Sequence, residues 1–289
     1  VTGASGFIGL NLLKKLSAYN ASILVIDRNQ PAEHIPRVEF EWADLRHLNK
    51  VYEADYLIHL AAITNSGYAE KYPLETYEVN VLGTVNLLNH VKIKERILFP
   101  STALIYKASE IPLDEHSVMD VSATYAQSKF IGEQITEFRS KLMEVPYTIV
   151  RFFNIYGPGQ QSMYIVPQIL RQVFEDRVVV LRNGSVMRDM LYVEDCMNAV
   201  TKLLVTDKAR NSVFNIGSGR KVSILDIAKS IVSVSNYKDV EIQDKKESIY
   251  LSPSIIMANI GKLQATIDWC PQTSLTEGFE KTWEFYIRP

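Results

Sequence analysis

The segment Val1-Thr2-Gly3-Ala4-Ser5-Gly6-Phe7-Ile8-Gly9 decides the fold that we expect for this chain. Its three glycines lie three residues apart, between the end of a predicted strand and a predicted helix over residues 7–16. Gly3 would form a tight turn, Gly6 would let a pyrophosphate approach the backbone, and Gly9 would let the helix pack closely on a sheet. The N–H groups at the start of the helix would then bind the phosphates of a dinucleotide.

The residues after this turn supply the context that a glycine triplet needs, which is a second strand and an acidic residue about 20 positions further on. Ile23-Leu24-Val25-Ile26 is the predicted strand, and Asp27 stands at its end. Its carboxylate can accept hydrogen bonds from a ribose and would repel a 2′-phosphate, which favours NAD over NADP. Arg28 weakens this preference, because an arginine can accommodate the phosphate. Only Val1 and Thr2 represent the first strand, so we expect further residues upstream of Val1.

Length and composition indicate a globular protein of one large domain or two interlocked ones, with 289 residues of which 47% are hydrophobic. No apolar run approaches the roughly 18 residues of a membrane span. A net charge of −2 argues against nucleic-acid binding, which normally needs a basic face. Cys196 and Cys270 have neither a CxxC partner nor a nearby histidine cluster. We therefore predict reduced thiols, no metal site and a cytoplasmic location.

Several predicted elements place candidate residues at one edge of a sheet. Residues 38–42 alternate like a strand and run into Asp44 and Leu45, which could meet an adenine ring, although a plain polar loop is an equal alternative. A helix is predicted from Pro73 through Val91.

Two further runs are predicted to be buried parallel strands. Residues 56–62 end in Leu60-Ala61-Ala62, which would lie at the carboxyl end, where ligands bind in such sheets. We interpret His59 in this run as a core histidine. Residues 96–99 form the other strand, and Pro100-Ser101-Thr102 follow it, either facing the same crevice or forming a simple turn.

The helix after Ser122 carries the residues that are most suggestive of chemistry. Ser122 is suited to cap its N-terminus, and apolar side chains recur at helical spacing at Ile131, Ile135, Phe138 and Leu142. Tyr125 and Lys129 are four residues apart and therefore lie on one face. Such pairs are common on exposed helices, so this pair gains its weight from the glycine turn and from the hydroxyls of Ser101 and Thr102.

Together these motifs resemble the extended short-chain dehydrogenase/reductase family, and within it the nucleotide-sugar epimerases and dehydratases. The first half of the chain contributes Gly3-x-x-Gly6-x-x-Gly9, Asp27, Asp44-Leu45, Leu60-Ala61-Ala62, Asn80-Val81-x-Gly83-Thr84, Ser101-Thr102 and Tyr125-x-x-x-Lys129. The second half contributes Arg151-Phe152-Phe153-Asn154, Arg188-Asp189, Phe214-Asn215-Ile216-Gly217 and Thr273-Ser274-Leu275-x-Glu277-Gly278. The resemblance covers essentially the whole chain.

The resemblance implies a reaction that moves a hydride from a sugar carbon to nicotinamide while a base removes the hydroxyl proton. It assigns the base to Tyr125. A free tyrosine has a pKa of about 10, so ionising it near pH 7 costs about 4 kcal/mol. The Lys129 cation and the positive nicotinamide would both favour the phenolate. Thr102 would hydrogen-bond the reacting sugar oxygen, with Ser101 as a neighbouring support.

The resemblance also implies the binding residues. An NAD site would comprise Gly3, Ser5, Gly6, Phe7, Ile8, Gly9, Asp27, Arg28, Asp44, Leu45, Leu60, Ala61, Ala62, Asn80, Ser101, Tyr125 and Lys129. A nucleotide-diphosphate sugar would contact Thr102, Asn154 and Arg188. A simple ion pair between Arg188 and Asp189 is the alternative. Whether residues 64–66 and Tyr164 leave room for an N-acetyl group stays open.

The implied architecture is a doubly wound parallel (Rossmann) sheet with a smaller α/β substrate-binding domain. The NAD-binding domain would comprise residues 1–154 and 190–216, and the nucleotide-sugar domain residues 155–189 and 217–289. A homodimer would form through the helices near residues 76–92 and 122–142.

Positions at which the chain departs from the family reduce the number of reactions that it could catalyse. Ala103 and Leu104 follow Thr102, where sugar 4,6-dehydratases carry an acidic pair and decarboxylases a glutamate. Residues 248–259 also depart from the charged segment that the family has there. A 4-epimerase fits best, because Asp27 suits a retained NAD. The alternative is a 4-keto-sugar reductase that consumes NAD(P)H, and a remote one is a non-catalytic NAD-binding sensor.

Overall fold

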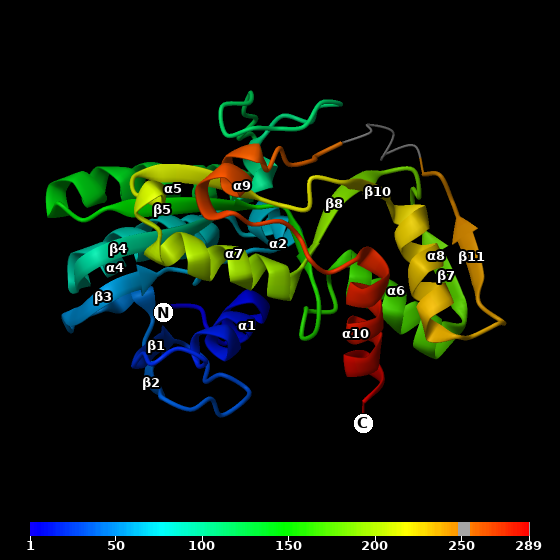
Figure 1. Ribbon diagram of the computed structural model, residues 1–289, viewed down its shortest axis with the longest axis horizontal. Coiled ribbons are helices and arrows are strands. Elements are labelled where there is room, and N and C mark those ends of the chain that lie inside the picture. Colours follow the sequence, from blue (N-terminus) through cyan, green and yellow to red (C-terminus); the bar gives the residue numbers. More distant parts are fainter. Residues whose placement is uncertain (248–254, 289) are drawn as a thin grey trace.

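The computed structural model of the protein describes residues 1–247 and 255–288. A large parallel sheet with flanking helices forms one part of the molecule, and short strands with helices form a smaller part beside it (Figure 1).

Within the described residues, six parallel strands form the central sheet, as a pair and a block of four that Thr2 joins. Their order is β2 (Val38–Trp42), β1 (Ile23–Asp27), β3 (Tyr52–Ile58), β4 (Val91–Thr102), β5 (Tyr147–Phe152) and β9 (Ser212–Ile216). Thr2 joins β1 to β3 through parallel bridges to Ile26 and His59. This bridge is all that represents the predicted first strand. The chain order reverses at Thr2, and in such sheets the carboxyl edge at the reversal is where ligands bind.

Helices cover both faces of this sheet, because successive side chains of its strands enter different hydrophobic cores. Leu57, Ile97 and Ile149 pack in one core together with residues of α4 (Gly83–His90). Ile58, Leu98 and Val150 pack in the other, with α1 (Phe7–Leu16) and α7 (Val193–Val205). The predicted doubly wound α/β class is confirmed.

The helix predicted from Pro73 to Val91 is correct in place and wrong at its end. It consists of α3 (Pro73–Tyr77), a wider π-helical turn (Glu78–Leu82) and α4, which stops at His90. Val91 already belongs to β4, which begins five residues before the predicted strand of residues 96–99. Valine suits either structure on hydrophobic pattern, and pairing with Tyr52 of β3 decides for the strand.

Tyr125 and Lys129 lie on α5 (Thr124–Met143), and the N-cap predicted for this helix is wrong. Ala123 occupies the N-cap position and makes no side-chain cap, so Ser122 does not cap the helix. Glu70, from α2 (Ser66–Lys71), takes this role: its carboxylate accepts hydrogen bonds from Thr124 N at 2.7 Å and Thr124 Oγ1 at 3.0 Å. A carboxylate is well suited to the positive end of a helix dipole.

The smaller part contains two short sheets and most of the remaining helices. One sheet has the order β10 (Lys221–Ser223), β8 (Met187–Tyr192), β6 (Asn154–Tyr156), and the other pairs β7 (Val178–Leu181) with β11 (Glu241–Asp244). The helices of the smaller part are α6 (Ile165–Arg171), a π-helical turn (Gln172–Asp176), α8 (Ile224–Ser235) and α10 (Leu275–Ile287), whereas α9 (Gly261–Ile267) packs beside β9 and α7 of the larger part (Figure 1). Short 3-10 turns span Leu45–His47, Ala103–Ile105 and Asp207–Ala209.

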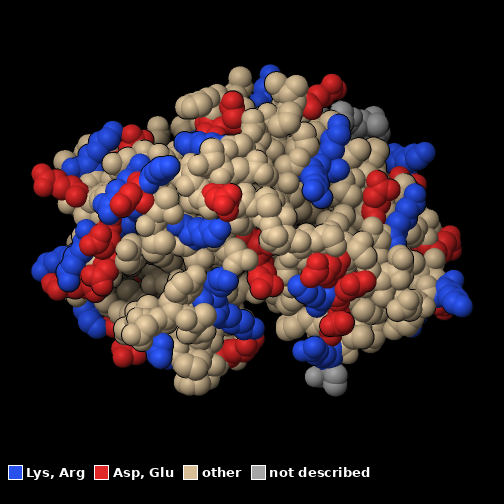
Figure 2. Space-filling model, in the orientation of Figure 1, with Lys and Arg blue, Asp and Glu red and all other residues tan. Residues whose placement is uncertain are grey.

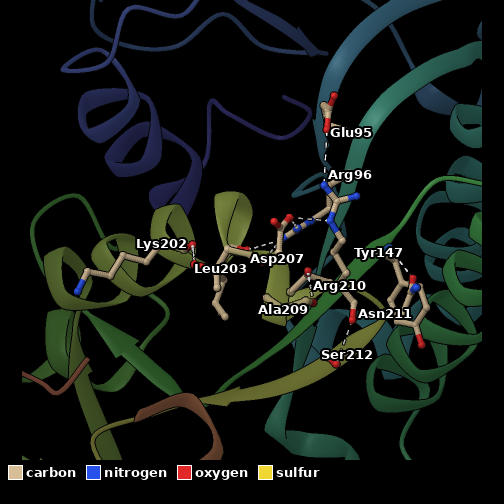
Figure 3. A network of polar contacts seen from close by, with 12 residues as sticks. Glu95, Arg96, Tyr147, Lys202, Leu203, Asp207, Ala209, Arg210, Asn211 and Ser212 are labelled. Carbon is tan, nitrogen blue, oxygen red and sulfur yellow. Dashed lines mark hydrogen bonds and ion pairs between the residues drawn. The ribbon is translucent and has the colours of Figure 1, made fainter. Parts of the chain in front are cut away.

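A buried arginine ties α7 to the central sheet. Arg96 on β4 donates from Nη1 to the carbonyl oxygens of Leu203 at 2.6 Å and Thr206 at 2.8 Å (Figure 3). These carbonyls lie at the C-terminal end of the helix, where they lack intrahelical partners. Asp207 follows in the next turn and pairs with Arg210 at 2.9 Å. The side of the sheet away from the cavity described below is therefore held by charged and main-chain groups together.

The cysteines, the helix lengths and the surface charge can each be compared with what the sequence predicts. Cys196 is buried, Cys270 is exposed, and both are free thiols. Among residues 1–247 and 255–288, no helix is long and apolar enough to cross a membrane. Basic and acidic side chains are interspersed over the face shown in Figure 2.

Candidate active site

A cavity of about 750 Å³ lies at the carboxyl edge of the central sheet, between the sheet and the smaller part. Every predicted site residue except Asn80 lines it. These residues are Gly3, Ser5, Gly6, Phe7, Ile8, Gly9, Asp27, Arg28, Asp44, Leu45, Leu60, Ala61, Ala62, Ser101, Thr102, Tyr125, Lys129, Asn154 and Arg188. The fold thus brings together groups that are almost 190 positions apart in the chain.

The glycine turn has no room for side chains at two of its three positions. Gly3 has φ +70°, and a Cβ there would lie 2.3 Å from Ala61 N. A Cβ on Gly9 would lie 2.4 Å from the Cα of Ala4. At Gly6 the nearest atom would be 3.5 Å away, so this glycine faces the cavity without close packing. This is the division of roles that a pyrophosphate-binding turn requires, and the turn fits a dinucleotide.

Two carboxylates stand beside the turn, and each is held by a neighbour. One oxygen of Asp27 accepts hydrogen bonds from Ser5 N at 3.0 Å and Ser5 Oγ at 2.7 Å. Asp44 accepts from Arg46 through Nε and Nη2, the latter at 2.6 Å. This bidentate bond lowers the pKa of Asp44 to about 2 despite partial burial. Asp27 is therefore oriented by the turn itself, and Asp44 by an arginine that the sequence analysis did not single out.

Asn80 lies behind the cavity wall and does not line the cavity. Its Oδ1 accepts from Ile63 N at 2.7 Å, and its Nδ2 donates to Ile63 O at 3.0 Å and Ser128 Oγ at 2.9 Å. Ser128 precedes Lys129 on α5 and donates to the carbonyl of Tyr125. Asn80 thus connects the loop after β3 to the helix of the Tyr/Lys pair.

His59 is a core histidine, as interpreted from the sequence. Its Nδ1 lies 2.7 Å from Thr2 Oγ1, and its Nε2 lies 2.9 Å from Thr84 Oγ1. Because the Thr84 hydroxyl donates to the Asn80 carbonyl, it accepts the proton of Nε2. Burial lowers the pKa of His59 to about 3, so the ring is neutral near pH 7.

Thr102 and Tyr125 face the cavity from β4 and α5. The Thr102 hydroxyl accepts a hydrogen bond from Leu104 N at 3.2 Å and lies within reach of Tyr125. Burial raises the pKa of Tyr125 above its ordinary value, the nearby Tyr164 raises it further, and the Thr102 hydroxyl acts in the opposite sense. The phenol is therefore protonated near pH 7 in the unliganded protein.

Lys129 is buried, with its ammonium 4.3 Å from the centroid of the Phe99 ring. Burial lowers its pKa to about 8, while Glu133, one helical turn further on, opposes this shift. Gly132 allows the ring to approach, because a Cβ there would lie 2.5 Å from the Phe99 Cζ. A cation over an aromatic face is stabilised by the ring quadrupole.

A buried ion pair connects α5 to β5 of the central sheet. Arg151 on β5 donates to Glu133 from Nε at 3.0 Å and from Nη2 at 2.7 Å. Both side chains are almost completely buried. Arg151 Nη1 also donates to Tyr106 OH at 2.7 Å and to the carbonyl of Glu115 at 3.0 Å. The Glu133 carboxylate, which raises the pKa of Lys129, is thus itself paired with Arg151 and held in position.

The remaining predicted ligand-binding residues approach from the smaller part. Asn154 Nδ2 donates to the carbonyl of Asp189 at 3.2 Å, and Arg188 Nη1 donates to the carbonyl of Met187 at 2.8 Å. The Asp189 carboxylate accepts from the backbone N–H groups of Ser218 at 2.6 Å, Gly219 at 3.0 Å and Ala258 at 2.9 Å. Asp189 therefore holds loops in place. Residues 248–259 were noted above because they differ from the charged segment that the family has there. Of these, residues 248–254 lie outside the described part of the chain.

Part of the lining was not predicted. It comes from the turn before α6 and from the residues around the predicted ones, and includes Asn29, Arg46, Ile63, Val79, Phe152, Gln160, Gln161, Met163, Ile165, Val166, Met190 and Ile256. In the sequence, the two closely spaced glycines Gly157 and Gly159 are the signal that could have drawn attention to the segment after them. In the structure both have positive φ, +152° and +82°.

The fold and this site together define a class. A glycine turn at the reversal point of a doubly wound sheet, with a tyrosine, lysine and hydroxyl at the same edge, is the arrangement of a dinucleotide-dependent enzyme. Residues 1–217 match the model of the "NAD dependent epimerase/dehydratase family". The chain belongs to this family, which confirms the resemblance and the prediction of an NAD-dependent enzyme.

Individual relatives are similar over nearly their whole length. A putative UDP-glucose 4-epimerase of Methanocaldococcus jannaschii is 26% identical, over 97% of this chain and 95% of the relative. A UDP-N-acetyl-alpha-D-glucosaminuronate decarboxylase of Bacillus cytotoxicus is also 26% identical, over 99% and 96%. The crystal structure of a Bacillus cereus UDP-glucuronic acid 4-epimerase with UDP-glucuronic acid and NAD has a TM-score of 0.87 and 25% identity, covering 98% of this chain and 97% of that one.

Proposed function

We propose that this protein is an NAD-dependent nucleotide-sugar 4-epimerase, which oxidises C4 of the sugar to a ketone and reduces it again from the other face. The observation that carries this proposal is the wall beside Thr102. Ala103 and Leu104 both line the cavity there. Neither side chain can transfer a proton, so elimination of water or loss of a carboxylate has no acid or base at this place. The chemistry that Thr102 and Tyr125 can support is proton exchange at one hydroxyl.

NAD, when bound, supplies the acceptor for the C4 hydride and returns it. The glycine turn would hold its pyrophosphate and Asp27 its adenosine ribose, with Asp44 and Leu45 beside the adenine. The Lys129 ammonium would bind the nicotinamide ribose. Its position over the Phe99 ring stabilises the cation, which burial otherwise disfavours.

Tyr125 would take the proton of the C4 hydroxyl and give it back after the sugar has turned over. Burial raises the pKa of this phenol, and the positive nicotinamide, when bound, would lower it and favour the phenolate. Thr102 would donate a hydrogen bond to the same sugar oxygen, whose charge changes during the reaction.

The substrate would be a nucleotide-diphosphate sugar, with Asn154 and Arg188 contacting its diphosphate. Burial lowers the pKa of Arg188, which remains a cation near pH 7. Relatives named as UDP-sugar enzymes support a uridine nucleotide. In this proposal residues 1–154 and 190–216 bind NAD, and residues 155–189 and 217–289 bind the sugar nucleotide.

We also propose a homodimer through the helices near residues 76–92 and 122–142. Leu82, Phe138 and Leu142 are 59%, 62% and 61% exposed on these helices. Apolar side chains exposed together on neighbouring helices are suited to a helix-to-helix interface between two copies.

The test is incubation with NAD and a panel of UDP-sugars, with the C4 configuration followed by proton NMR. We expect interconversion of gluco and galacto forms without net reduced cofactor. Tyr125→Phe should lower the rate by about 10²–10⁴-fold, whereas Tyr19→Phe, an exposed tyrosine outside the cavity, should not. An unchanged C4 configuration throughout the panel would contradict the proposal. Consumption of NAD(P)H with 4-keto sugars would then identify a reductase, and cofactor binding without turnover a sensor.

A further inference from the structure

Two segments that are about 100 residues apart meet at the mouth of the cavity. Thr64 Oγ1, from the loop after β3, lies 3.1 Å from Tyr164 OH, at the start of α6. Beside it, Asn65 Nδ2 donates to Met163 Sδ at 2.8 Å. All four side chains line the cavity. The central sheet and the smaller part are thus connected across the space that a sugar nucleotide would have to enter.

Both segments are fixed at their bases. Asn65 caps α2, since its Oδ1 accepts from Tyr68 N at 2.6 Å, and Asn80 holds the backbone of Ile63 on both sides. On the other side Gln168 Nε2 donates to the carbonyl of Met163 at 2.8 Å. The loops are therefore positioned by helices, independently of the contacts between them.

The contacts across the mouth are of a weaker kind. Each is a single hydrogen bond, and Thr64 and Met163 are exposed while Asn65 and Tyr164 are partly buried. Bonds between such side chains exchange readily with water, so they can open one at a time without unfolding either loop. Rigid loops with a reversible link suit a site that must admit a ligand and then retain it.

The link lies at the reacting end of the cavity. Tyr164 is close enough to Tyr125 to act on its electrostatics. The glycine turn, in contrast, has Asp27 beside it and takes no part in the contacts between Thr64, Asn65, Met163 and Tyr164.

We propose that Thr64 and Tyr164 form a latch that retains the oxidised sugar inside the cavity until it has been reduced again. This proposal rests on the proposed 4-epimerase function. An epimerase must let the keto sugar change the face that it presents, so the reacting ring cannot be held rigidly, and a closed mouth has to prevent its escape. Each escape would leave one sugar oxidised at C4, having lost a hydride and a proton, and one cofactor reduced by that hydride, with the proton left on Tyr125. Thr64 and Tyr164 are positioning residues in this step.

The latch can be opened at either partner, and Thr64→Val does so without changing the Tyr164 hydroxyl, which influences the pKa of Tyr125. Thr64→Val and Tyr164→Phe each remove the hydroxyl and keep the shape of the side chain. Tyr68→Phe is the matched control, because its hydroxyl bonds to Glu75 outside the cavity. During turnover of a UDP-hexose, reduced cofactor is followed at 340 nm, and released keto sugar is trapped with borodeuteride and identified by mass. We expect both variants to release about tenfold more keto sugar per epimerisation event than the parent, and the double variant to release no more than the stronger single one.

A second measurement separates this proposal from the proposed function. In a Tyr125→Phe background, which removes the base, the dissociation rate of a UDP-hexose from the NAD-loaded protein is measured by stopped flow. Added Thr64→Val or Tyr164→Phe should speed dissociation about tenfold, and Tyr68→Phe should leave it unchanged. Equal dissociation rates would overturn the latch whether or not the parent epimerises. If the variants speed dissociation but the parent protein never epimerises a UDP-hexose, the proposed function is overturned and the latch remains as a device that retains a ligand.

Discussion

The cavity has two ends that are built by different kinds of atom. At the glycine end, formed by Gly3, Gly6, Gly9 and Asp27, the walls are main-chain atoms so close that a methyl group does not fit at Gly3 or Gly9. At the tyrosine end, formed by Thr102, Tyr125, Lys129 and Tyr164, charged and polar side chains from distant segments face one another.

A different physical term controls each end. Contact between main-chain atoms depends on shape and is insensitive to pH. Charges buried beside α5 depend on their partners and on protonation, because an unpaired ion is costly in a dry environment. Substitutions at the tyrosine end should therefore have larger and pH-dependent effects on stability, and those at the glycine end smaller and pH-independent ones.

The largest effect is expected at the buried ion pair beneath the tyrosine end. Arg151→Met leaves the Glu133 carboxylate buried without its bidentate partner and should lower the free energy of unfolding by about 3–5 kcal/mol. Urea denaturation measures this loss. Replacing both residues, with Glu133→Leu as the second change, should recover part of it. The exposed Arg171→Met is the control and should shift stability by less than about 0.5 kcal/mol. A loss as small as that of the control would mean that the pair contributes little.

The next effect concerns the pH dependence of stability at Lys129. Its pKa is about 8 in the folded protein, against an ordinary value of 10.5. Between these two values the unfolded chain binds more protons than the folded one, so the free energy of unfolding should rise with pH. The full rise is about 3 kcal/mol, at 1.36 kcal/mol per pKa unit. Below pH 8 this group should add no pH dependence.

Lys129→Met provides the reference for that measurement, because methionine fills similar space and does not titrate. The stability of the parent minus that of the variant, from urea midpoints, should rise across the window and be flat below it. A flat difference throughout would show that the ammonium keeps its ordinary pKa in the folded protein.

The smallest effects are expected at the glycine end, where two variants separate packing from ligand binding. Gly9→Ala brings a Cβ within 2.4 Å of backbone atoms and should cost about 1–3 kcal/mol of stability at every pH. Gly6→Ala meets nothing closer than 3.5 Å, so it should fold normally but weaken NAD binding about tenfold. Thermal unfolding with and without NAD, together with calorimetric titration, distinguishes them. Equal destabilisation by both variants would contradict this division of roles.

The same difference explains what the sequence could predict. The glycine end is encoded locally, because glycine spacing and one acidic residue specify a turn and its neighbour. The cavity lining at this end was therefore predicted almost residue by residue. Arg46 escaped notice because nothing in its spacing shows that it turns back onto Asp44.

The tyrosine end was predicted only where helical spacing carried the information, as for Tyr125 and Lys129. Met163 and the contact of Tyr164 with Thr64 depend on two loops meeting in space, which one sequence does not reveal. Asn80 was assigned to the cofactor, yet its side chain is occupied by Ile63 and Ser128 behind the wall. A polar residue near a site can serve the backbone as readily as the ligand.

Gly132 has a consequence for how this site can vary. The spacing between α5 and the sheet is set there by the absence of a single methyl group, since any larger residue would displace the Phe99 ring or the helix. Lys129 rides on that helix and rests on that ring. A residue that does not line the cavity therefore acts as a spacer for Lys129, the lysine of the proposed active site. Its tolerance for substitution should resemble that of an active-site position, although its side chain is a hydrogen atom.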